Sequence, residues 1–88
     1  MNAPTRQQVA AAFGGILRTA RDAAELSQEQ LAEKADIDRT YPSLLERGLR
    51  HPTLYMLLRL ASAVDMEPGL MVAATARACQ AWLLKDSS

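Results

Sequence analysis

Apolar side chains recur three or four residues apart along most of the chain, and no stretch alternates apolar and polar residues at every second position. This spacing is typical of amphipathic helices rather than strands. Glycine and proline are sparse and stand mostly between the periodic segments, where they act as breaks. The pattern therefore predicts an all-α chain with five helices, at about 6–24, 28–35, 39–47, 54–64 and 68–85.

Polar residues at the predicted helix starts supply capping groups. Thr5 with Gln8, and Ser27 with Gln30, have the spacing of a capping box, in which each side chain accepts a hydrogen bond from the backbone amide of the other residue. Thr53 can cap the fourth helix in the same way. These residues predict where three of the helices begin.

Glycine and aspartate mark the positions where special backbone geometry is expected. Gly48 follows the third helix as a left-handed C-terminal cap, and Asp36 stands where the chain must turn after the second. Gly14 and Gly15 interrupt the first helix, at about 1 kcal/mol each relative to alanine. We expect a close approach of another helix to be the reason for both.

The apolar residues of the last two helices are expected to form buried faces. For the fourth helix these are Leu54, Leu57, Leu58, Ala61 and Val64. For the fifth, which begins near Pro68, they are Met71, Val72, Ala78, Cys79, Trp82 and Leu83.

The second and third predicted helices are short and joined by a tight turn, which is the arrangement of a helix-turn-helix over about 27–48. Such a crossing needs a small side chain, and Ala32 stands at that point. Ile37 and Leu45 are expected to fill the core beneath the second helix of the pair.

Composition and charge indicate a single domain with an uneven distribution of basic residues. The chain has 88 residues, 49% of them hydrophobic, and a net charge of zero, so one folded domain over 1–88 is expected. The basic residues are unevenly placed: four arginines and a single acid, Glu46, lie in the segment from Arg39 to Arg59. One basic patch on a neutral body is compatible with binding a polyanion on one face.

Several other classes of protein are disfavoured. A single cysteine, Cys79, excludes an internal disulfide and cannot assemble a zinc site, so neither a metal nor a cofactor is expected. One histidine, and no glycine-rich phosphate loop, argue against an enzyme. No apolar stretch approaches the roughly 20 residues of a membrane span, and no export signal opens the chain. A cytoplasmic protein is expected.

Three stretches together resemble a known family. Ser27-Gln28-Glu29-Gln30-Leu31-Ala32, the run from Asp38 to Gly48, and Pro52-Thr53-Leu54 are similar to the Cro/phage-repressor type of helix-turn-helix, the xenobiotic-response-element family. The resemblance covers about 13–72. The run Asp38-Arg39-Thr40-Tyr41 is also similar to controller proteins of restriction–modification systems.

This resemblance implies a five-helix, lambda-repressor-like DNA-binding domain with an extended C-terminal helix. It further implies a transcriptional regulator, a repressor or an activator, that binds double-stranded DNA as a homodimer on a near-palindromic operator. Such a protein would be associated with the nucleoid when bound.

The resemblance also implies roles for individual residues. Arg39, Thr40 and Ser43 would read base edges in the major groove, and Leu44 would either contact a thymine methyl group or face solvent. The residues implied to contact phosphate or to brace the contact are Gln28, Tyr41, Arg47, Arg50 and His51, with packing as the alternative for Tyr41. Arg21 and Glu46 match an ion pair that joins the first helix to the end of the third.

Two alternatives concern the C-terminal helix and the partner. Val72, Cys79, Trp82 and Leu83 are expected at a dimer interface, although Trp82 and Leu83 could instead fold back on the first helix near Val9 or Phe13. A protein-interaction module, such as an antitoxin that masks a toxin, would keep the same fold. A protein partner such as a toxin or a polymerase therefore stays an alternative to DNA alone.

Overall fold

The computed structural model describes residues 3–86, with the side chains of 82–86 excepted. These residues form α1 (Arg6–Ala23), α2 (Gln28–Ala35), α3 (Tyr41–Glu46), α4 (Leu54–Ala63) and α5 (Pro68–Asp86), and no strand occurs among them. The predicted all-α architecture with five helices is confirmed. Helix α3 begins later and ends earlier than expected, and it has only six residues.

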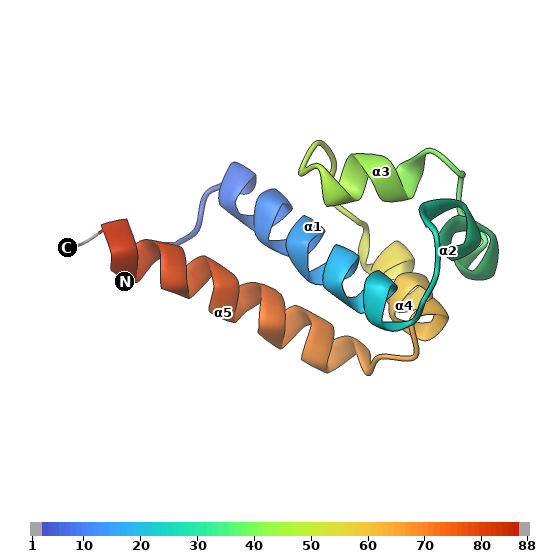
Figure 1. Cartoon of the computed structure of the whole chain (residues 1–88). Helices are drawn as coiled ribbons and strands as arrows, with labels where there is room; N and C mark the ends of the chain where they lie inside the picture. Colours follow the sequence, from blue (N-terminus) through green and yellow to red (C-terminus); the bar gives the residue numbers. More distant parts are fainter. Residues whose placement is uncertain (1–2, 87–88) are drawn as a thin grey trace.

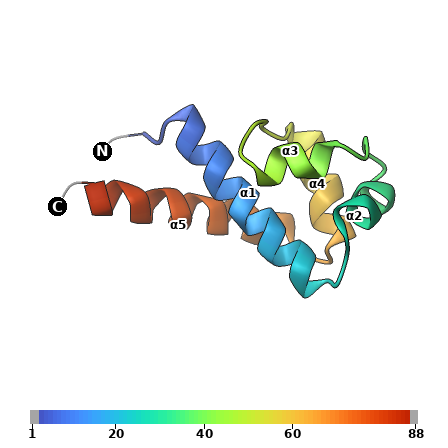
Figure 2. The same ribbon diagram turned by 45° about the horizontal axis from the view of Figure 1, so that its top comes forward.

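The long helix α1 lies at the centre of the arrangement, with α3 on one side and α5 on the other (Figure 1). Helix α2 contacts α3 and α4, and α4 also contacts α5. The start of α1 and the end of α5 lie together at one end of the molecule, away from α2 and α4 (Figure 2). The two short helices α2 and α3 are therefore carried on a frame made by the other three.

The predicted helix starts are confirmed by their capping contacts. The amide of Gln8 donates to the Thr5 hydroxyl at 3.1 Å and that of Gln30 donates to the Ser27 hydroxyl at 3.0 Å, and both boxes are completed by the glutamine side chains. Thr53 accepts from the Met56 amide at 3.1 Å. Each cap satisfies a backbone donor that has no partner within its helix.

The core draws at least one completely buried side chain from every helix. Leu17 of α1, Leu31 of α2, Leu45 of α3, Leu60 of α4 and Met71 of α5 all belong to a single buried cluster. Because every helix contributes to the same cluster, the position of α3 depends on packing with distant parts of the chain.

The buried face of α4 differs from the one expected. Leu54 is 72% exposed and Leu58 is 47% exposed, whereas the buried residues of the segment include Leu60, Ala61 and Val64. Tyr55, Arg59 and Ser62 recur at helical spacing as a polar stripe along α4, and Leu54 and Leu58 border that stripe on the side that faces solvent. The assignment of Leu54 and Leu58 to the core was wrong.

Helix α5 is also apolar on more than one side. Met71 and Cys79 are buried, whereas Val72 is half exposed. Cys79 is 4% exposed, and its sulfur lies 3.9 Å from the backbone oxygen of Gln8 on α1. Cys79 thus packs within one chain, which is a correction to its expected place at a dimer interface. Trp82 and Leu83 lie outside the described side chains.

Candidate nucleic-acid interface

The turn between α2 and α3 is fixed by backbone hydrogen bonds. Asp36 takes the left-handed conformation with φ 56°, as predicted, and its amide donates to the oxygen of Glu33 at 3.2 Å. The amide of Ile37 donates to the oxygen of Ala32 at 3.0 Å. Ala32, the small residue expected at the crossing of the two helices, is buried. The chain therefore leaves α2 in a defined direction before α3 begins.

Asp38 organises the entry into α3. Its carboxylate accepts from the Thr40 amide at 2.8 Å and from the Thr40 hydroxyl, and its backbone oxygen accepts from the Tyr41 amide at 3.0 Å. The hydrogen bonds from Thr40 hold the pKa of the Asp38 carboxyl below its ordinary value. Asp38 is therefore ionised at neutral pH, and the Thr40 hydroxyl has a fixed orientation.

One side of α3 faces outward and the other faces the core. Pro42 and Leu45 are buried, whereas Arg39, Thr40 and Arg47 are exposed. Ser43 and Leu44 are partly exposed and lie three and four residues beyond Thr40, and Arg47 follows after the same interval, so these side chains share one helical face. Helical spacing thus puts Thr40, Ser43, Leu44 and Arg47 on one side, and Arg39 is exposed in the turn just before them.

The other predicted contacts are placed differently. Tyr41 packs against the core, and its hydroxyl donates to the backbone oxygen of His51 at 3.5 Å. Nε2 of His51 is buried and has no hydrogen-bond partner among the described residues, so this nitrogen does not face outward as a phosphate contact would require. Arg50 is exposed, and its guanidinium donates to the neighbouring Leu49 oxygen at 3.3 Å.

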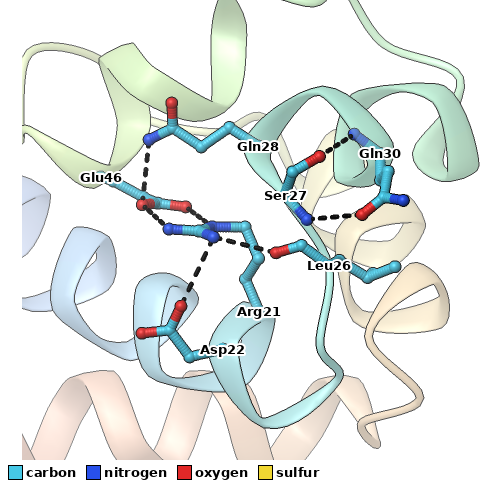
Figure 3. A network of polar contacts seen from close by, with 7 residues as sticks. All are labelled: Arg21, Asp22, Leu26, Ser27, Gln28, Gln30 and Glu46. Atoms are coloured by element: carbon cyan, nitrogen blue, oxygen red, sulfur yellow. Dashed lines mark hydrogen bonds and ion pairs between the residues drawn. The ribbon is translucent and has the colours of Figure 1, made fainter.

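A partly buried polar network ties the end of α3 to α1 (Figure 3). Nε of Arg21 donates to Oε2 of Glu46 at 2.7 Å and Nη2 donates to Oε1 at 2.9 Å, which makes a bidentate pair. Nη1 of Arg21 donates to the backbone oxygen of Leu26 at 2.9 Å. The hydrogen bond with Glu46 raises the pKa of the Arg21 guanidinium above its ordinary value. The guanidinium of Arg21 is therefore held in its charged form and in a fixed orientation.

Gln28 joins the same network, which the sequence did not reveal. Its side-chain nitrogen donates to Oε1 of Glu46 at 3.2 Å (Figure 3). The amide oxygen of Gln28 takes no part in that bond. Gln28 is thus held at the start of α2 by the same carboxylate that anchors α3.

Gly14 brings α1 against the backbone of α3. A Cβ atom at Gly14 would lie 2.5 Å from the Leu45 oxygen and 2.7 Å from the Glu46 oxygen, well inside van der Waals contact. A Cβ atom at Gly15 would meet nothing within 4 Å. The predicted close approach is therefore found at Gly14 and is wrong for Gly15.

The charge of the patch follows from these contacts. Glu46 is the only acid between Arg39 and Arg59 in the sequence, and its side chain is 4% exposed and paired with Arg21. Arg39, Arg47 and Arg50 are exposed. Because the one acid of this segment is turned inward and neutralised, the outward field of the patch is more positive than the net charge of the chain suggests.

Two kinds of feature are absent from the part of the chain that the structure describes. No three His, Cys, Asp or Glu side chains among residues 3–81 come together as metal ligands would. None of the helices as described combines the length and apolarity needed to cross a bilayer.

Two short helices with a fixed turn, and an outward basic face on the second, define a helix-turn-helix protein. A family model described as "Helix-turn-helix" matches residues 17–70. The chain belongs to this family, in its Cro/C1-type branch.

Individual proteins agree with this assignment. The chain is 37% identical to the control protein C.BamHI of Bacillus amyloliquefaciens, over 64% of this chain and 70% of that protein. The restriction–modification controller protein C.AhdI of Aeromonas hydrophila has a similar structure, with a TM-score of 0.68 and 44% identity over 70% of this chain and 94% of that one.

A longer relative matches only in part. The uncharacterized HTH-type transcriptional regulator MT0491 of Mycobacterium tuberculosis is 39% identical over 58% of this chain. The match spans 36% of that regulator, so the likeness concerns the helix-turn-helix region.

Proposed function

We propose that the chain is a transcriptional regulator that binds a specific sequence of double-stranded DNA. The observation that carries the proposal is the exposure of Arg39, Thr40 and Arg47 at the two ends of α3, with Ser43 partly exposed on the helix between them. Behind this face, Leu45 and Pro42 are buried and Glu46 is anchored to α1. A rigid helix with arginine and hydroxyl side chains on its open face has the chemistry needed to read base edges in a major groove.

The proposed DNA-contacting residues are of two kinds: those that contact base edges and those that contact phosphates. Arg39 can donate two hydrogen bonds to guanine O6 and N7, and Thr40 and Ser43 supply hydroxyl groups beside it. Arg47 and Arg50 are exposed cations suited to phosphate oxygens. The relatives named as transcriptional regulators and controller proteins support this use of the fold.

The first experiment identifies the preferred DNA sequence and then tests a variant that lacks two of the proposed base contacts. Duplexes selected from a random pool by the purified chain give the preferred sequence. Arg39→Ala with Ser43→Ala is then expected to lower affinity for that duplex by at least about tenfold and to relax base preference, because each bidentate contact contributes about 1–3 kcal/mol of discrimination.

Arg77→Ala is the matched control, because Arg77 is an exposed arginine on α5, which lies on the other side of α1 from α3. It should leave base preference unchanged. If the double variant kept the affinity and base preference of the unaltered chain, the reading face would lie elsewhere.

We also propose that the chain acts as a homodimer on a near-palindromic operator. A single small module binds DNA weakly, and two modules can read half-sites one duplex turn apart. The proposed contact is the outer side of α5, where Val72 is half exposed, continued by Trp82 and Leu83 in the sequence.

Trp82→Ala is expected to make the chain monomeric at micromolar concentration, because aromatic side chains contribute strongly to interfaces. Sedimentation equilibrium measures the change, and Arg77→Ala on the same helix serves as a control for a substitution at an exposed position. A dimer that persists in Trp82→Ala would place the interface on another surface.

A further inference from the structure

The side chain of Arg59 joins α4 to the end of α2, and the proposed function does not use it. In the sequence, Arg59 is one of the four arginines of the basic segment. In the structure its Nε donates to the backbone oxygen of Ala35 at 2.7 Å. Ala35 is the last residue of α2, and the carbonyl groups at the end of a helix have no partner within it.

Two further contacts hold the guanidinium in place. Nη1 donates to the hydroxyl of Tyr55, one turn earlier on α4, at 2.8 Å. Nη2 lies 3.4 Å from the carboxylate of Asp36, the left-handed residue of the turn. All three guanidinium nitrogens are therefore engaged, and the positive charge stands at the negative end of the α2 dipole.

The contact between Arg59 and the end of α2 lies next to the turn that leads into α3. Helices α2 and α4 lie side by side (Figure 1). Only the residues from Asp36 to Thr40 connect α2 to α3, and α3 has six residues, too few to hold a helical conformation without support. Arg21 and Glu46 fix the far end of α3. Arg59 fixes the end of α2, from which the chain continues through the turn to the start of α3.

We infer that Arg59 is a positioning residue, which sets the direction of the turn and through it the presentation of Arg39, Thr40 and Ser43. This inference rests on the proposed function. It assigns Arg59 to the support of the reading helix, although its place in the basic segment would suggest a phosphate contact.

The two roles differ in how binding depends on salt. A side chain that neutralises a phosphate adds about one unit to the slope of log affinity against log salt concentration. A side chain that only orients the reading helix changes affinity and leaves that slope unaltered. Arg50→Ala, which removes a proposed phosphate contact, is the comparison variant and should reduce the slope by about one.

The test measures operator affinity at several salt concentrations for Arg59→Ala, Arg59→Lys and Arg50→Ala. Arg59→Ala should lose on the order of tenfold in affinity with the slope unchanged, because a charged hydrogen bond to the backbone is lost. Arg59→Lys should recover part of the loss, because an ammonium group can reach one acceptor but lacks the planar fork.

A second measurement, without DNA, tests whether Arg59 holds the turn between α2 and α3 in place. The amides of Asp36 and Ile37 are bonded within the turn, so their hydrogen exchange should be faster in Arg59→Ala, whereas exchange at Leu17 in the core of α1 should stay slow. Unchanged turn exchange, unchanged affinity, or a slope reduced by one would each overturn the inference. If the unaltered chain bound no duplex, the proposed function would fail, and turn exchange would still report whether Arg59 holds the turn.

Discussion

Replacing Gly14 with alanine is expected to lower the free energy of unfolding by about 1–3 kcal/mol, the range for overfilling a packed interior. The added Cβ would lie 2.5 Å from the Leu45 oxygen and 2.7 Å from the Glu46 oxygen. Both obstructing atoms belong to the backbone, so no side-chain rotation can make room. Helix α3 would have to move away from α1, and the reading face would move with it.

Gly15→Ala is the matched control, because the substitution is the same and the position is adjacent. A Cβ atom at Gly15 meets nothing within 4 Å. Alanine is favoured over glycine inside a helix by about 1 kcal/mol, so Gly15→Ala should stabilise the chain. Urea unfolding followed by circular dichroism measures both variants. Effects of the same sign and size would show that the contact between α1 and α3 is looser than the structure has it.

Features set by neighbouring residues could be predicted from the sequence. The capping boxes at Thr5 and Ser27 and the left-handed turn at Asp36 depend on side chains within a few positions of one another. The exposed face of α3 belongs to the same class, because helical spacing alone puts Thr40, Ser43 and Arg47 together.

Features set by contacts between distant elements could not be predicted in the same way. Leu54 and Leu58 border the polar stripe of α4, and the packing of the other helices decides that this part of its circumference faces solvent. The role of Arg59 depends on a carbonyl group 24 positions earlier in the chain. The burial of Nε2 of His51 likewise depends on how the loop after α3 folds back.

Contacts with distant elements are also what hold α3, the proposed reading helix, in its orientation. Helix α3 has two buried residues, Pro42 and Leu45, and Tyr41 packs partly buried beside the core. A six-residue helix with two buried side chains gains little stability from its own hydrogen bonds. Its orientation is therefore set by contacts from α1 at one end and from the turn at the other, and the contact with α1 includes the most deeply buried charge in the network.

Arg21→Met is accordingly expected to have the largest effect on stability, lowering the free energy of unfolding by about 3 kcal/mol, the low end of the range for breaking a buried ion pair. The low end applies because the side chain of Arg21 is still 13% exposed. The variant leaves the carboxylate of Glu46, which is 4% exposed, with Gln28 as its remaining side-chain partner. Arg18→Met, at an exposed position on the same helix, should change stability by less than about 0.5 kcal/mol.

The double variant Arg21→Met with Glu46→Met separates the pair from the charge left behind. When both charges are replaced by apolar side chains of similar size, no ion is stranded, and such exchanges are often neutral or stabilising. Urea unfolding should therefore find the double variant more stable than Arg21→Met alone. If Arg21→Met and Arg18→Met behaved alike, the pair would carry no stability. A double variant that regained stability but lost operator affinity would show that the ion pair orients α3, since its rigid bidentate geometry would then be the property that DNA binding requires.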